Sequence, residues 1–223
     1  MANASPKGSI IYKIIIVILA VALIVTILFP KSLWNKEEKN TKECHKRMEH
    51  ILSAELLYLS RFNTYQDTLR KVVNMIKEDT SGALIIDYVK MDSVLSSDII
   101  NTLRQRNQTL MVLIDSLKAF GKRTEIDTLE RLIIDSLRTL PSITQKIDSI
   151  ALLSLDSLFV CPTTRDTYKI TVIDTSVIKN LRIACPIDSL DSLKVSNDFI
   201  LSKIGALKIS NHGDIDGGLK SWE

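Results

Sequence analysis

Hydrophobic and polar positions follow different periods along the chain, and the first region is apolar throughout. The run "IIIVILAVALIVTILF" extends from Ile14 to Phe29, and its only polar residue is Thr26. Together with the preceding "SIIYK" it reaches about 20 residues, the length that crosses the hydrocarbon core of a bilayer. We therefore predict an amino-terminal tail over residues 1–8 and a transmembrane anchor over residues 9–30.

A cleaved signal peptide is the alternative interpretation of this run. The apolar stretch is longer than a typical signal-peptide core, and "PKSLWNKEEK" follows it without a small-x-small cleavage site. Lys13 can extend to the membrane surface, and Tyr12 and Trp34 stand where interfacial aromatic residues are found. These features favour an uncleaved, single-pass anchor.

The orientation of the anchor depends on two conflicting signals. Lys7 and Lys13 precede the apolar run, whereas more lysines follow it, namely Lys31, Lys36, Lys39 and Lys42. The positive charges alone favour a cytoplasmic carboxyl-terminal part. A short tail before a long soluble region is instead typical of an exported domain. We expect export, with the anchor in the inner membrane and the soluble part in the periplasm.

Helical periodicity dominates the middle of the chain. Apolar residues recur at three- and four-residue intervals at Met48, Ile51, Leu52, Leu56 and Leu59, which predicts a stalk that continues as an amphipathic helix. The pattern breaks near Asn63 and resumes after Asp67 or Thr68, the expected N-cap. We predict stalk and amphipathic helices over residues 31–80 and a helical region over residues 81–158, with a long helix from Ala83 to Lys122 that starts irregularly at "ALIIDYVKMD".

The period changes to two near the carboxyl end. In "TYKITVI" and "NLRIAC" apolar residues alternate with polar ones, which predicts two strands joined by a turn near Thr175, with Tyr168 opposite Arg182. We assign residues 159–223 to a β-hairpin region and tail. The fold class is therefore α+β, mostly α, with a small antiparallel β region after the helices.

Composition and motifs narrow the function classes. The net charge is +3 and the two signs are mixed along the chain, which argues against a nucleic-acid partner. Triplets of the type Asp-Ser/Thr-Leu/Ile recur at irregular intervals, which excludes a repeat of fixed period, and several of them predict helix starts. The sequence contains none of the G-x-S-x-G, H-E-x-x-H, P-loop or dinucleotide-binding motifs, and we expect no enzymatic activity.

The cysteines carry the main chemical question. Cys161 and Cys185 flank the predicted hairpin, and in an exported domain we expect them to form a disulfide that contributes about 3 kcal/mol. A zinc site is the less favoured alternative, because neither cysteine belongs to a C-x-x-C pair and His45, His50 and His212 are scattered. Cys44 is left over, either as a free thiol or for an intermolecular bond.

One pattern resembles a known family. "AELLYLSRFNTYQDTLRKV" after a membrane helix, followed by a small β region, is similar to the pseudopilins of type II secretion and related type IV filament systems. The matching residues are Ala54, Glu55, Tyr58, Tyr65 and Leu69, which the resemblance implies are packing and helix-ending elements. The chain departs from the family at the processing site, where Ser9 follows Gly8 and Lys13 stands in place of a glutamate, and in the insert between Leu84 and Leu158. The overall design also resembles single-pass envelope proteins of Bacteroidota-type bacteria.

The same resemblance implies a calcium site. "NHGDIDGG" offers the oxygen ligands Asn211, Asp214 and Asp216 on a glycine-rich loop, although a polar turn is the favoured interpretation, and we expect no other cofactor. We predict a membrane-anchored, exported structural or assembly subunit of a cell-envelope complex. Its partners are the membrane and other envelope proteins or copies of itself. An exported ligand-sensing module that acts through a membrane partner is the alternative.

Overall fold

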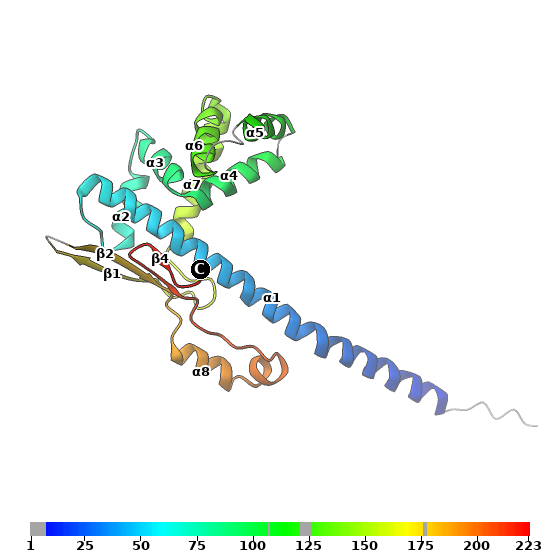
Figure 1. Ribbon diagram of the computed structural model, residues 1–223. Coiled ribbons are helices and arrows are strands. Elements are labelled where there is room, and N and C mark those ends of the chain that lie inside the picture. Colours follow the sequence, from blue (N-terminus) through cyan, green and yellow to red (C-terminus); the bar gives the residue numbers. More distant parts are fainter. Residues whose placement is uncertain (1–7, 107, 121–125, 176–177) are drawn as a thin grey trace, which may run out of the picture. The chain divides into compact units, whose positions relative to one another are not determined.

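The chain is mostly helical and carries a small antiparallel sheet near its carboxyl end, as the sequence predicts (Figure 1). The computed structural model describes residues 8–106, 108–120, 126–175 and 178–223. The helices are α1 (Gly8–Phe62), α2 (Leu69–Lys77), α3 (Ala83–Met91), α4 (Ser93–Arg106), α5 (Gln108–Phe120), α6 (Ile126–Leu137), α7 (Pro141–Ser157), α8 (Ser189–Asn197) and the π-helix η1 (Phe199–Ile204). The strands are β1 (Lys169–Asp174), β2 (Lys179–Ala184), β3 (Asp214–Asp216) and β4 (Leu219–Lys220).

The chain divides into two compact units that are each described by themselves. The first unit consists of Met1–Thr41 and Ile187–Asn211, and the second, which we call the globular unit, consists of Lys42–Pro186 and His212–Glu223. Helix α1 runs through both units without interruption. Of the predicted tail, residues 1–8, only Gly8 lies within the described residues.

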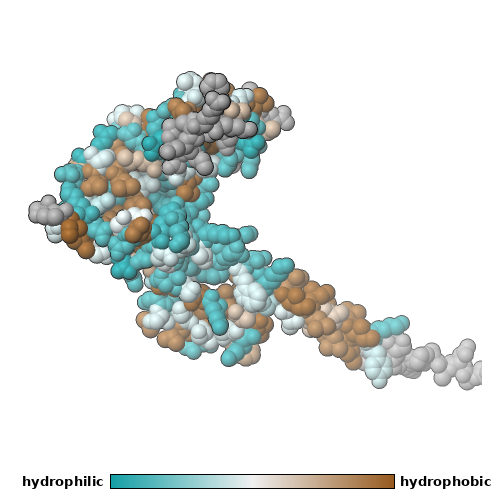
Figure 2. All heavy atoms as spheres, in the orientation of Figure 1, coloured by the Kyte–Doolittle hydropathy of each residue, from teal (hydrophilic) through white to brown (hydrophobic). Residues whose placement is uncertain are grey.

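The first half of α1 is apolar and exposed. The large apolar side chains from Ile14 to Leu28 are exposed, and Leu23 is 64% exposed. Figure 2 shows a hydrophobic surface along this part of the helix. Within the described residues this is the one helix that is long and apolar enough to cross a membrane, a property that an anchor and a signal sequence share.

The second half of α1 is packed into the globular unit. Cys44, Met48, Ile51, Ala54 and Leu57 are buried at three- or four-residue intervals. Three polar side chains, His50, Ser53 and Glu55, are buried as well, so the buried face is not purely apolar and the predicted amphipathic character is not confirmed.

The end of α1 is where the sequence predicts it. The helix stops at Phe62, and Asn63 turns the chain with a left-handed φ of 56°. The buried Glu55 accepts a hydrogen bond from the backbone N–H of Gln66 at 3.0 Å, which fixes the link to α2. Thr68 is the N-cap residue of α2.

The predicted long helix from Ala83 to Lys122 is wrong, because Asp92 interrupts it. Its extended backbone (φ −99°, ψ 96°) ends α3, and its carboxylate accepts the backbone N–H of Leu95 at 2.8 Å, which starts α4. The same carboxylate pairs with His50 at 2.6 Å, so a buried polar pair joins this break to α1. The core around it is formed by apolar side chains of α2, α3, α4, α6 and α7.

The sheet has the order β1-β2-β3-β4, with antiparallel neighbours throughout. The predicted hairpin is confirmed, but its register is not: Thr171, not Tyr168, lies opposite Arg182. The backbone N–H of Thr175 donates to the carbonyl of Ile178 at 2.8 Å, and residues 176–177 lie outside the described residues. Strands β3 and β4 were not predicted. Gly217 and Gly218, with φ of 56° and 86°, form their two-residue turn, which requires left-handed backbone at both positions.

Candidate metal centre

Four buried side chains from four separate segments meet in the globular unit. They are Cys44 on α1, Cys161 between α7 and β1, Cys185 directly after β2, and His212 before β3. Their ligand atoms all lie within 4.8 Å of one another. Cys44 and Cys161 are fully buried, and Cys185 and His212 are 1% and 7% exposed. We call this group the Cys/His cluster.

The strand pairing positions two of the four residues. Strand β2 pairs with β3 up to Ala184 and Asp214, and the backbone N–H of Cys185 then donates to the carbonyl of Gly213 at 3.1 Å. Cys185 and His212 therefore leave the sheet next to each other, although 26 residues separate them in sequence. The sheet register, rather than sequence spacing, brings them together.

A tight loop presents Cys161. Its backbone N–H donates to the carbonyl of Asp166, and its own carbonyl accepts from the N–H of Arg165, both at 2.9 Å. Arg165 has the left-handed φ of 65° that this turn requires. Arg47, one helical turn after Cys44, donates to the carbonyl of Val160 at 2.7 Å. This contact fixes the loop against α1, so that both sulfurs face the same space.

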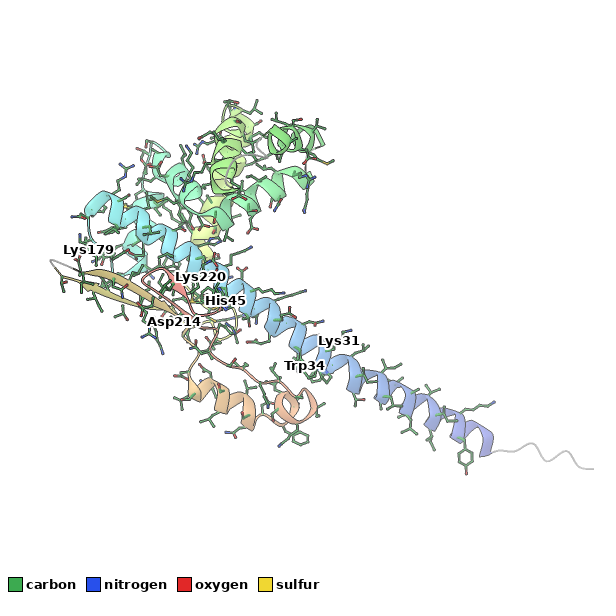
Figure 3. The ribbon with its side chains drawn as sticks, in the orientation of Figure 1. Lys31, Trp34, His45, Lys179, Asp214 and Lys220 are labelled. Carbon is green, nitrogen blue, oxygen red and sulfur yellow. The ribbon has the colours of Figure 1, made fainter. Side chains whose placement is uncertain are left out.

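Polar and aromatic neighbours surround the cluster. The Tyr168 hydroxyl donates to the sulfur of Cys44 at 3.5 Å. The Nε2 of His45 is hydrogen-bonded to the carbonyl of His212 at 2.6 Å, and its ring stacks on Trp222 with centroids 4.0 Å apart. Figure 3 labels His45 on α1, where it approaches the carboxyl-terminal segment. His45 therefore orients the backbone that carries His212 without belonging to the cluster.

Hydrogen bonds within the cluster shift the pKa values of Cys161 and Cys44 in opposite directions. Hydrogen bonds from Cys185 and Cys44 lower the pKa of Cys161, and the His212 side chain and the backbone N–H of Thr164 lower it further. The pKa of Cys44 is raised, because its proton is shared with Cys161 and Cys185 and its surroundings are buried. Burial also raises the pKa of Tyr168, which stays a neutral donor.

The expected disulfide between Cys161 and Cys185 is not formed. All three cysteines are free and buried, and they are not at disulfide distance. The physical reason is that a third thiol lies at the same place. Cys44, to which the sequence analysis gave no role, is hydrogen-bonded to both Cys161 and Cys185. The favoured interpretation considered two of the three thiols and missed the third.

The three residues expected to bind calcium are engaged elsewhere. Asp214 pairs with Arg182 at 2.6 Å, and Asp216 accepts the side-chain amide of Asn180 at 2.8 Å. Both carboxylates flank the buried Ile215 on β3, and Figure 3 labels Asp214. The Asn211 side chain donates to the carbonyl of Ile187 at 2.7 Å. The calcium site stays a prediction, without support from these contacts.

Sequence reasoning missed Cys44 and His212 as members of the cluster. The intervals between its members are 117, 24 and 27 residues, far from those of any short zinc motif. One signal was present: each of the last three members is followed directly by a proline or a glycine, and Cys161 and Cys185 flank the predicted hairpin. That signal locates turns, but it does not indicate that the turns meet.

Comparisons with known proteins provide no family for the chain: no family model matches it, and neither the curated proteins nor the solved structures contain a match.

Proposed function

We propose that the Cys/His cluster binds one Zn²⁺ ion as a structural centre of a membrane-anchored, non-enzymatic assembly subunit. The observation that carries the proposal is the ligand set: three thiols and one imidazole, buried and within 4.8 Å of one another. Cys₃His is a ligand set of structural zinc sites. Four protein ligands complete a tetrahedral shell, so no position remains for water or a substrate.

The geometry suits zinc well. Zn–S and Zn–N bonds of about 2.0–2.3 Å place tetrahedral ligand atoms about 3.5–3.8 Å apart. The cluster reaches that spacing by contracting slightly around an ion. Thiolates with one imidazole select zinc over calcium or magnesium, which prefer oxygen ligands. The hydrogen bonds from Tyr168 to Cys44 and from the Thr164 N–H to Cys161 are of the kind that orient metal-bound thiolates.

The proposed role of the ion is to fasten segments that the sheet alone does not hold. It joins α1, the loop before β1, the end of β2 and the start of β3. Such a centre stabilises a surface for partners and supplies no reactive group. It therefore supports the structural or assembly role expected from the sequence, with the apolar half of α1 as the membrane anchor.

The ligand-sensing alternative receives less support from the globular unit. An open groove of about 630 Å³ is lined by α1, α4 and α7 and includes Glu43, Lys46, His50 and Asp98. These charged groups already pair: Lys46 with Asp98 at 2.5 Å, Glu43 with Arg47 at 2.9 Å, and His50 with Asp92. A charged ligand in this groove would have to displace existing ion pairs.

We further propose that the globular unit faces the cytoplasm, which reverses the expectation of export. A reducing compartment keeps three adjacent thiols available for a metal, whereas an oxidising one favours a disulfide between two of them. The lysines after the apolar run, among them Lys31 and Lys36, point to the same side. Carboxyl-terminal fusions test this orientation: a green fluorescent protein fusion is expected to fluoresce, and an active alkaline phosphatase fusion contradicts the proposal.

The assembly role is tested by extracting the full chain from its membrane in mild detergent and identifying the proteins that stay bound. The parent is compared with His212→Gln, which removes a cluster residue, and with His50→Gln, a buried histidine outside the cluster. We expect a stable complex that survives in the parent and in His50→Gln and is lost in His212→Gln. A parent chain that elutes as a monomer without partners contradicts the role.

A further inference from the structure

The segment between β2 and β3 leaves the globular unit and belongs to the first unit. Residues 187–211, which contain α8 and η1, form a compact unit with the first part of α1. The indole N–H of Trp34 donates to the carbonyl of Ala206 at 3.2 Å, and Figure 3 labels Trp34 on α1 at this level. Gly205 lies against Leu33 of α1, and a Cβ atom at this position would lie 2.7 Å from the backbone carbonyl oxygen of Leu201, so the end of η1 needs glycine here.

These contacts fix the position of the segment along the axis of α1. Trp34 follows the last residue of the apolar run, Phe29, by five positions, which is about 7.5 Å along a helix. The headgroup region of a bilayer extends about 5–8 Å beyond each side of the hydrocarbon core. The end of η1 therefore lies at the depth of the lipid headgroups when the apolar run spans the bilayer.

The segment exposes large apolar side chains at that depth. Leu190, Leu193, Phe199, Ile200 and Ile204 are between 44% and 68% exposed, and α8 and η1 contain no buried residue. In water a nine-residue helix without a buried face has little to stabilise it. At an interface the same side chains enter the acyl region, and each fully inserted one contributes about 1.5–3 kcal/mol.

The polar residues of the segment also suit an interface. Asp188 closes a capping box with Asp191, and the Asp198 carboxylate accepts the backbone N–H groups of Ile200 and Leu201 at 2.9 and 3.0 Å. Both turns are thus ordered by carboxylates that cap them. The three lysines of the segment balance its three aspartates, so the positive charge that favours anionic headgroups comes from Lys31 and Lys36 on α1.

We propose that α8 and η1 form a second membrane contact, lying in the bilayer interface beside the anchor with Phe199 and its apolar neighbours among the acyl chains. The proposal rests on the anchor proposed above. The occupant of the apolar surface is lipid, because the contacts at Leu33 and Trp34 hold the segment next to the spanning helix. The chain thus returns to the membrane between two cluster residues, Cys185 and His212.

The test adds one tryptophan at a time to the full chain, reconstituted in nanodiscs whose lipids carry bromine on their acyl chains. Phe199→Trp probes the proposed contact, Leu23→Trp probes the apolar run, and Leu153→Trp on α7 is the matched control. Phe199, Leu23 and Leu153 are 68%, 64% and 69% exposed, so each variant replaces an open side chain. Emission of the parent chain, with Trp34 and Trp222, is subtracted.

The added emission at position 199 is expected to be quenched several-fold more strongly than at position 153 and less than at position 23. Quenching at 199 equal to that at 153, with strong quenching at 23, overturns the second contact and leaves the anchor intact. Emission at 199 that resists both brominated lipid and aqueous iodide also overturns it, because a protein then covers the surface. Absence of quenching at 23 rejects the anchor itself.

Discussion

The helices and the sheet of the globular unit are held together in different ways. Apolar burial stabilises the helical part: Ile76, Ile99, Ile133 and Ile147 on four different helices are fully buried. In the strands only Leu181, Ile183 and Ile215 are buried within the described residues, and β1 has no fully buried side chain. A sheet this small gains from an additional link, and the proposed zinc site would supply one where β2 ends and β3 begins.

The two regions therefore differ in how much of each can be predicted from the sequence. Apolar periodicity predicts the helical core and one hairpin, whereas the cluster depends on contacts between segments that are far apart in the sequence. Disrupting each fastening separately should therefore affect one region and spare the other.

Removal of a cluster residue is expected to have the largest effect. His212→Gln should weaken zinc binding by more than about 100-fold, because loss of a hydrogen-bond partner of a ligand alone costs about 10- to 100-fold. Amide hydrogen exchange should accelerate in β1, β2 and β3 and stay slow in α4 and α7. His50→Gln is the control, since it removes a buried imidazole outside the cluster. Equal metal content in the two variants would refute the assignment.

A cavity in the helical core is expected to lower the stability of the helices and to leave the cluster unchanged. Ile147 on α7 is fully buried, and Ile147→Ala should lower the free energy of unfolding by about 2–5 kcal/mol. The zinc content should not change, because the cluster draws no residue from this helix. Denaturant unfolding and metal analysis of the same sample provide the two readouts. Metal loss in this variant would mean that the two regions are not separable.

Glu55 predicts a pH dependence that belongs to the packing of α1. Burial raises the pKa of this carboxyl from 4.5 to about 7, with a smaller contribution from Asp67. The folded state therefore binds the proton more tightly than the unfolded state. Its contribution to stability is fully present below pH 4.5 and is lost as the pH rises through about 7, by about 3 kcal/mol.

The substitution Glu55→Gln should remove this dependence of the free energy of unfolding on pH. The variant is expected to keep its stability between pH 5 and 8 while the parent loses about 3 kcal/mol, as measured by denaturant unfolding at each pH. The difference between the two curves isolates this carboxyl from all other titrating groups. Parallel curves would show that Glu55 is ionised in the folded protein across this range.

Tyr168→Phe is expected to give the smallest effect. The change removes only the hydroxyl that donates to Cys44. Metal affinity should fall by about 10-fold, as is typical when a ligand loses its hydrogen-bond partner. Competition with a chromogenic chelator measures the affinity, and hydrogen exchange of the sheet should be unchanged in excess metal. An unchanged affinity would mean that the hydroxyl is not coupled to the sulfur.

Local features of the chain could be predicted because local patterns determine them. The end of α1 near Asn63, the β1–β2 hairpin and the capping Asp at 188 follow from helical period, alternation and cap chemistry. The irregular start expected at "ALIIDYVKMD" ends at Asp92, but a full helix break there could not be predicted, because its partner His50 is 42 residues away. The short strand β3 was hidden, because it has one apolar residue, Ile215, between two aspartates.

The cluster could be predicted only in part. Cys161 and Cys185 were expected to lie close together, and their sulfurs do meet in the cluster, but not at disulfide distance, and their chemistry depends on Cys44 and His212. Both residues reach the site through tertiary contacts, Cys44 through the packing of α1 and His212 through the pairing of β3 with β2. The expectation of export then selected a disulfide, which three converging thiols do not favour.

The central claim is tested most directly by the metal and thiol content of the full chain, purified in detergent without chelators. We expect one equivalent of zinc and three thiols that react with a maleimide only after a chelator is added. Replacement by Co²⁺ should give the intense visible absorption of a tetrahedral thiolate site. A chain without metal that contains a disulfide between Cys161 and Cys185 would contradict the account.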